Sequence, residues 1–306
     1  MLTLLVVVVG LGGALIYGAA DFFGGLASRS ISTIRVTAIG VISGLVVLVL
    51  ALPVVGGQWS TQAALFGGLS GVVGAGAIVL LYACLSLGPM SILSPLTAVV
   101  SAIVPMTAGL IRGERLDPLG YLALVLALVA VVLVGFVPAR TALRPTLKAL
   151  TMATGAGTLI GAFLILIDMT PDNSGLVPLI VNRVVSGAVM FTAIGLIALV
   201  AARNRRLLRR FPSVDDSAAL RDGPRTTPWL PALKLAVLAG ALDAVANALI
   251  LSGLRLGELT IMSVLVAMYS AGTIILAAVV LKERLTASQV FGLILALSAA
   301  AMLAVV

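Results

Sequence analysis

Ten apolar stretches separated by short polar gaps fill most of this sequence. Each is close to the roughly 20 residues that an α-helix needs to cross the hydrocarbon core of a bilayer. Backbone groups in lipid must be satisfied within a helix or a closed barrel, and these stretches lack the period-two alternation of barrel strands. The sequence therefore predicts an all-α integral membrane protein with ten transmembrane helices. The predicted helices are Leu4–Ala27, Arg35–Pro53, Gln62–Leu85, Met90–Ile111, Pro118–Val137, Leu147–Met169, Leu176–Ala202, Leu230–Leu254, Glu258–Leu281 and Ala287–Val306.

Composition supports a membrane location and excludes several functions. Of the 306 residues, 61% are hydrophobic and only 10% are charged, whereas soluble domains contain about 25% charged residues. The basic residues lie in the gaps, without the interleaved aromatic residues of a nucleic-acid-binding surface. With no histidine and the single Cys84, the chain contains no recognisable catalytic constellation, metal cluster or intramolecular disulfide. We therefore expect no enzyme activity, no cofactor and no bound metal.

The second half of the chain repeats the first. Residues 85–130 align without a gap with residues 254–299, and roughly 18 of about 46 aligned positions are identical, far above chance. We predict two units of five helices, residues 1–139 and 140–306, the second of which carries a polar loop at residues 203–229. Because five is an odd number, tandem units cross the membrane in opposite senses. The sequence thus predicts two inverted five-helix repeats around a central cavity.

The charges of the gaps predict an orientation. The first apolar stretch follows no basic segment and is too long for a signal-peptide core, so we expect a retained transmembrane helix. Roughly 15 basic residues then fall in gaps on one side of the membrane, among them seven arginines between Arg203 and Arg225. Basic loops mark the cytoplasmic side, which predicts that both termini lie outside.

Four segments carry a family pattern. Each half ends with a turn that precedes an apolar helix, at Gly113–Leu116 and at Lys282–Leu285. The opening helix, with Leu15–Ser30, and the sixth helix, from Gly155, combine glycines with a few polar residues. Together with ten helices and the duplication, this pattern resembles the EamA-type members of the drug/metabolite transporter superfamily over nearly the full length. The resemblance implies ten helices around a cavity, cytoplasmic termini, and passage of small metabolites, amino acids or drugs, often outward.

Two acidic residues lie within predicted helices, where a charge costs about 2.5–3.5 kcal/mol on insertion scales. Asp243 lies near the middle of the eighth helix, and Asn247 follows one turn later on the same face. This pair could form a proton or cationic-substrate site, or the carboxylate could be protonated or paired with a basic residue. Asp21 in the first helix follows Tyr17 by one turn, and the two could face the cavity or serve a paired or snorkelling role.

Other polar residues have a structural alternative to a transport role. Arg183, beside Asn182, could bind a substrate carboxylate or phosphate, or pair with Asp168 or Asp243. Asp168 itself is expected to be solvated at the interface, and Glu114 and Glu283 to pair locally with their basic neighbours. Repeat-equivalent serines and two tyrosines could line the cavity or join helices. They are Ser94, Ser101, Ser263, Ser270, Tyr82 and Tyr269.

These features predict a multi-pass secondary transporter of the plasma (inner) membrane that moves small metabolites, amino acids or drugs by alternating access between inverted repeats, with export as the expected direction. The candidate partners are a small-molecule substrate, the lipid bilayer, a coupled proton and a second copy of the chain. Two alternatives stay open: a translocator of a lipid-linked head group, and a membrane scaffold that does not transport. The candidate substrate- or proton-binding residues are Tyr17, Asp21, Tyr82, Ser94, Asn182, Arg183, Asp243, Asn247, Ser263 and Tyr269.

Overall fold

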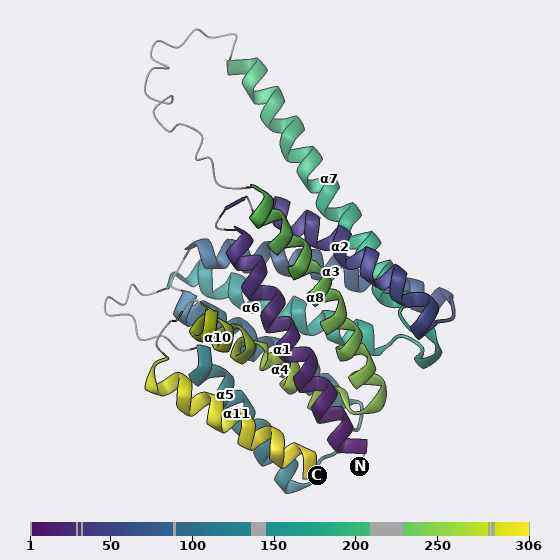
Figure 1. Ribbon diagram of the computed structural model, residues 1–306, viewed down its shortest axis with the longest axis vertical. Coiled ribbons are helices and arrows are strands. Elements are labelled where there is room, and N and C mark those ends of the chain that lie inside the picture. The colour runs from purple at the N-terminus through teal and green to yellow at the C-terminus, as the bar shows by residue number, and fades with distance from the viewer. Residues whose placement is uncertain are drawn as a thin grey trace.

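The computed structural model (Figure 1) describes residues 2–28, 30–31, 33–87, 90–135, 145–208, 229–280, 282 and 285–305, and within these it is almost entirely α-helical. Eight helical segments are long and apolar enough to cross a membrane, and two shorter apolar segments, 96–111 and 118–134, complete the ten expected spans. The prediction of an all-α ten-helix membrane protein is confirmed. The helices are α1 (Leu2–Ser28), α2 (Thr33–Val55), α3 (Thr61–Leu87), α4 (Met90–Ile111), α5 (Pro118–Gly135), α6 (Leu147–Asp168), the short 3-10 helix η1 (Asp172–Ser174), α7 (Val177–Leu208), α8 (Trp229–Leu256), α9 (Leu259–Ala267), α10 (Tyr269–Val280) and α11 (Ala287–Val305).

The ninth span is divided into α9 and α10, which meet at Met268. There the amide of Met268 donates to the carbonyl of Leu265, and the amide of Ala271 donates to the carbonyl of Met268. These hydrogen bonds span three residues and tighten the helix locally at Met268. The repeat-equivalent α4 contains two prolines and is nevertheless a continuous helix. Proline content alone therefore did not indicate which of the two equivalent spans would be interrupted.

The two halves of the chain are interleaved. Helix α1 packs on α8 just as α6 packs on α3, and α2 packs on α8 just as α7 packs on α3. Likewise α4 packs on α6, and its counterparts α9 and α10 pack on α1, while α5 packs on α11. Every one of these pairs has its counterpart when the halves are exchanged, as related repeats require. The boundary predicted between residues 139 and 140 lies outside the described residues.

Glycines permit the closest helix contacts. A side chain at Gly18 on α1 would lie 2.7 Å from the amide nitrogen of Thr273 on α10, so the two backbones touch there. Helices α2 and α8 meet in the same way at Gly40 and Gly240. Small residues replace a hydrophobic driving force in lipid because they let backbones approach and form many van der Waals contacts. These contacts fix the helices that surround the centre of the molecule.

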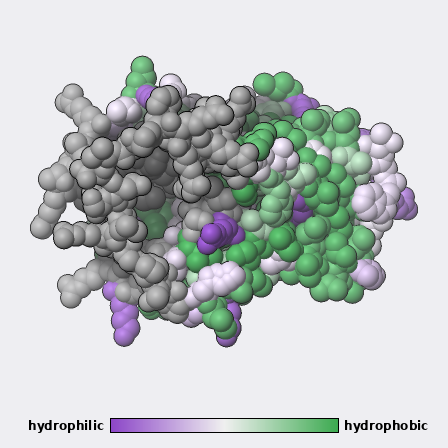
Figure 2. Space-filling view, turned by 90° about the horizontal axis from the view of Figure 1, so that it is seen from above, coloured by the Kyte–Doolittle hydropathy of each residue, from purple (hydrophilic) through white to green (hydrophobic). Residues whose placement is uncertain are grey.

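The two ends of the helix bundle differ. Figure 1 shows the N- and C-termini together at one end, which we call the termini end, and the C-terminal part of α7 projecting from the other, which we call the basic end. The basic end carries Arg35, Lys148 and Lys234 near the starts of α2, α6 and α8. Figure 2 looks onto this end and shows hydrophobic side chains over much of its described surface. Large apolar side chains such as Leu50 and Leu297 are exposed on the flanks, as lipid contact requires.

Candidate functional site

A cavity of about 240 Å³ lies between the two halves of the chain. Its walls come from α1, α2, α3 and α4 of the first half and from α6, α7, α8 and the junction of α9 with α10 of the second. Val36 and Ala236 line it near the basic end, and Asn182, Asn247 and Ile250 line it deeper in the bundle. The residues that line the cavity therefore lie within the membrane-spanning part of the helices, from the level of Val36 and Ala236 to that of Asn182 and Ile250.

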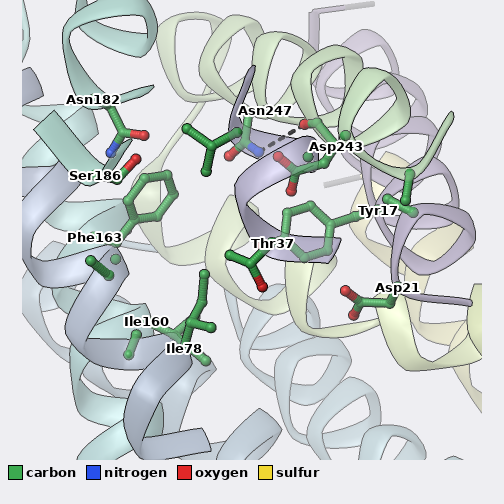
Figure 3. A pocket seen from close by; sticks show the side chains of 18 of the residues that line it. Tyr17, Asp21, Thr37, Ile78, Ile160, Phe163, Asn182, Ser186, Asp243 and Asn247 are labelled. Atoms are coloured by element: carbon green, nitrogen blue, oxygen red, sulfur yellow. Dashed lines mark hydrogen bonds between the residues drawn. The ribbon is translucent and has the colours of Figure 1, made fainter. Parts of the chain in front are cut away.

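Arg183 and Asp243 form a salt bridge across this cavity, from α7 to α8. A guanidinium nitrogen of Arg183 donates to Asp243 Oδ2, and both side chains are largely buried, with 15% and 23% of their surfaces exposed. One turn later, the side-chain amide of Asn247 donates to the backbone carbonyl of Asp243 at 2.8 Å (Figure 3). The sequence-based expectation that Arg183 pairs with Asp168 or Asp243 is thus resolved in favour of Asp243. A buried charge needs such a partner, because desolvation would otherwise be uncompensated.

Asp21 faces the cavity from α1, together with Tyr17 one turn earlier. The ring of Tyr17 meets the ring of Tyr269 edge to face, with centroids 5.6 Å apart, at the junction between α9 and α10. Within the described part of the chain, Asp21 has neither a salt bridge nor a hydrogen bond to its side chain. Of the two carboxylates on the described cavity wall, that of Asp21 is thus the one without a counter-charge.

The opposite wall is apolar. Ile78 from α3, with Ile160 and Phe163 from α6, faces the polar side of the cavity (Figure 3). Asn182 lies at the edge of this wall, and its amide donates to the hydroxyl of Ser70 at 2.9 Å, which joins α7 to α3. The cavity is therefore amphipathic, with its charges gathered on α1, α7 and α8.

Of the remaining candidate binding residues, none is found on the cavity wall among the residues whose side chains the structure describes. Ser263 on α9 is buried, its hydroxyl donates to the carbonyl of Thr260 at 2.8 Å, and it is not among the residues that line the cavity. The side chains of Tyr82 and Ser94 lie outside the described residues. Sequence reasoning missed Thr37 on α2 and Ser186 on α7, which both line the cavity. Thr37 shares a helix face with Val41, and Ser186 shares one with Arg183. The spacing from Arg183 was the signal in the sequence that could have identified Ser186.

Polar contacts join neighbouring elements at the termini end, and one of them links the two halves. Arg112, at the end of α4, donates to Asp168, at the end of α6, over 2.6 Å. Asp168 is therefore paired, and the expectation that it would simply be solvated was wrong. Arg255 donates to the hydroxyl of Ser174 at 3.0 Å and to the carbonyl of Gly175 at 2.8 Å. The contact of Arg112 with Asp168 links the two halves, whereas the contacts of Arg255 lie within the second half.

Glu114 has a role that its basic neighbours did not indicate. Its two carboxylate oxygens accept hydrogen bonds from the backbone amides of Leu259 and Thr260, at 3.0 and 2.8 Å. It thus caps the N-terminus of α9, where unpaired amides and the helix dipole favour negative charge. The expected local ion pair of Glu114 was wrong, while Glu283 lies outside the described residues.

Desolvation, and secondly the charge of Glu114, raise the pKa of Glu258, whose Oε2 is buried without a partner among the described residues.

Comparison with known proteins identifies the family. The EamA-like transporter family matches the chain twice, over residues 4–136 and 147–305. This chain belongs to the EamA-like transporter family. It is therefore a multi-pass membrane protein of a class that carries small molecules across lipid bilayers.

Structural comparison agrees with this EamA-like fold. One solved structure, described only as the crystal structure of a protein, superposes with a TM-score of 0.66 at 15% sequence identity. The match covers 97% of this chain and 94% of the other, so the two share a fold over their full lengths. The comparison with curated proteins found no significant match.

Proposed function

We propose that this EamA-like protein is a secondary transporter that exports small metabolites, amino acids or drugs across the plasma membrane by alternating access. The proposal rests on one observation above all: an amphipathic cavity lies between interleaved halves, and a salt bridge and an unpaired carboxylate face it. Charges at membrane depth are costly, and those that face a cavity typically mark a substrate or ion pathway.

The different closure of the two ends supports an alternating mechanism. Arg112 and Asp168 join the two halves at the termini end, whereas the residues that line the cavity reach toward the basic end as far as the level of Val36 and Ala236. A carrier must have one end closed while the other is open, and related halves can exchange these conformations. In the proposed cycle, the present arrangement is the state that opens toward the basic end.

The charge bias favours a cytoplasmic basic end. Arg35, Lys148 and Lys234 lie there among the described residues, and basic residues accumulate on the cytoplasmic side of membrane proteins. The cavity would then open to the cytoplasm and load the substrate from inside, as export requires. Both termini would lie outside, in contrast to the cytoplasmic termini implied by the sequence resemblance.

The test is a metabolite profile of the medium around cells that express wild-type protein, Asp243→Asn, or no copy. We expect at least one small metabolite to accumulate outside wild-type cells but not around Asp243→Asn cells, although both proteins reach the membrane. Asp117→Asn is the matched control, because Asp117 caps α5 at the termini end through the amide of Gly120, and asparagine can also cap. Equal profiles for wild type and cells without the protein would contradict the proposal.

Coupling to protons and assembly as a homodimer remain part of the proposal. Purified protein in vesicles would show proton coupling as substrate flux that responds to an imposed pH gradient. Crosslinking in the membrane would detect a second copy. Flux unaffected by the gradient would remove the proton from the mechanism and leave facilitated exchange.

A further inference from the structure

The net charge of the cavity defines a substrate class. Three ionisable side chains with formal charge at neutral pH line its described walls: Asp21, Arg183 and Asp243. Arg183 and Asp243 neutralise one another in their salt bridge. Asp21, when ionised, then leaves the cavity with one uncompensated negative charge. Its side chain is exposed on the cavity wall, where an incoming cation can supply the missing counter-charge.

We infer that the cavity binds amphiphilic organic monocations, with the cationic group at Asp21 and the two tyrosine rings. This inference rests on the proposed transport function and assigns a substrate class to the same cavity. Tyr17 lies one turn from Asp21 on α1, and the ring of Tyr269, which also lines the cavity, meets the ring of Tyr17 with centroids 5.6 Å apart. Aromatic rings attract ammonium groups through their quadrupoles, most strongly where water is excluded.

The apolar wall accounts for the rest of the ligand. Ile78, Ile160 and Phe163 face the polar side from α3 and α6, and they offer no hydrogen bond to a polar substituent. The volume of about 240 Å³ lies below the roughly 300–1,000 Å³ of pockets that take drug-sized ligands. A small molecule with one cationic group and one aromatic or aliphatic body matches both the size and the polarity.

The salt bridge argues against an anionic substrate. A substrate carboxylate or phosphate would have to displace Asp243 from Arg183 before it could use the guanidinium. It would also bring a second negative charge into a cavity that already contains Asp21. The carboxylate of a zwitterion would likewise have to displace Asp243 from Arg183, although its ammonium group could still bind at Asp21.

A set of four probes with one phenyl body and different charges tests the inference. The probes are phenethyltrimethylammonium, phenylalanine, hydrocinnamate and phenethyl alcohol. Binding to purified protein in detergent is measured by calorimetry, and flux is measured in vesicles of the same protein. The quaternary ammonium has no neutral form, so its flux reports the protein and not leakage through lipid.

We expect wild-type protein to bind the cation at least about tenfold more tightly than the zwitterion or the acid, a difference of about 1.4 kcal/mol. Asp21→Asn should remove this preference, and Asp117→Asn, a carboxylate neutralised outside the cavity, should retain it. Tyr269→Leu removes the ring and should weaken cation binding more than Tyr269→Phe, which keeps the ring. The ranking of probes on wild-type protein is independent of whether any variant folds.

Three outcomes separate this inference from the transport proposal. Preference of wild type for the acid or the zwitterion, or unchanged cation binding by well-folded Asp21→Asn, would overturn the cation site. Flux of phenylalanine without cation binding would overturn the site and leave transport intact. Cation binding at Asp21 without flux of any probe would support the site and contradict transport.

Discussion

The salt bridge between Arg183 and Asp243 makes a quantitative prediction about stability. Asp243→Asn leaves the guanidinium of Arg183 in the cavity without its counter-charge, and Arg183→Gln leaves the carboxylate alone. The double variant removes both charges and replaces them with neutral side chains of similar size. We therefore expect the double variant to be no less stable than the worse single variant.

The burial of the pair sets the magnitude. Removing one partner of a fully buried pair costs about 3–5 kcal/mol, whereas exposed pairs contribute about 0.2–1 kcal/mol. With 15% and 23% of the two side chains exposed and a cavity beside them, we expect about 1–3 kcal/mol for each single variant. The pair Arg112–Asp168 is the matched comparison. Because Arg112 is 39% exposed, the double-mutant cycle of this pair should give a coupling free energy below about 1 kcal/mol.

The assay is reversible unfolding of the purified protein by a denaturing detergent, followed for wild type, both single variants and the double variant. The coupling free energy is the difference between the double-variant effect and the sum of the single-variant effects. A strong coupling at Arg183–Asp243 and a weak one at Arg112–Asp168 is the expected result. Additive single effects at Arg183 and Asp243 would refute the idea that the two charges compensate one another.

Three further results are expected. Gly18→Ala should destabilise the protein by about 1–3 kcal/mol, because its new methyl group meets the backbone of α10, while Gly12→Ala on the same helix meets nothing within 4 Å and should unfold like wild type. Glu258→Gln should raise the melting temperature at neutral pH, and the gain should vanish as the pH falls below the usual glutamate pKa of 4.5, because the raised native-state pKa of Glu258 makes ionisation unfavourable to folding. A cysteine at Lys148 should react only with reagent from the cytoplasm, and one at Asp172 only from outside; the reverse would contradict the orientation.

The architecture was predictable because lipid leaves the backbone few options. Hydropathy predicted ten helices. The duplication predicted two related halves, and the helix pairs of one half have their counterparts in the other. Pairing of Arg183 with Asp168 or Asp243 was one of the alternatives expected from sequence, since a charge inside a membrane needs a partner and few were available. Which of the expected partners it would take depended on how α7 packs against α8, which no local pattern encodes.

The roles that sequence reasoning missed depend on distant packing. Arg115 follows Glu114 in the chain and suggested a local pair, yet the carboxylate binds amides 145 and 146 residues away. Gly109 leaves the space for it, because a side chain there would collide with Thr260 and with the carboxylate. The ninth span is likewise interrupted at Met268, between α9 and α10, which both pack on α1, and not at a proline. Local propensity was overruled in both places by contacts between the halves.

The sequence repeat is not exact, and its differences bear on the conformational balance. The residues at the repeat-equivalent positions of Arg112 and Arg255 are Leu281 and Ser86. Exchanging the conformations of the halves would close the basic end with these uncharged residues. They cannot reproduce the bond between the halves from Arg112 to Asp168, nor the bonds by which Arg255 fixes the loop at Ser174 and Gly175 within the second half. The protein should therefore favour the state in which the termini end is closed.

This asymmetry can be removed by substitution. Arg112→Leu combined with Arg255→Ser gives the termini end the residues of its counterpart, so both ends should then close with more similar free energies. In a background without Cys84, a cysteine introduced at Ser186 on the cavity wall reports the open end. We expect reagent from the termini side to label Ser186→Cys several-fold faster in the double variant, because a shift of about 1.4 kcal/mol changes a population ratio tenfold. Unchanged labelling from that side, with the protein folded, would mean that these arginines do not control which end is open.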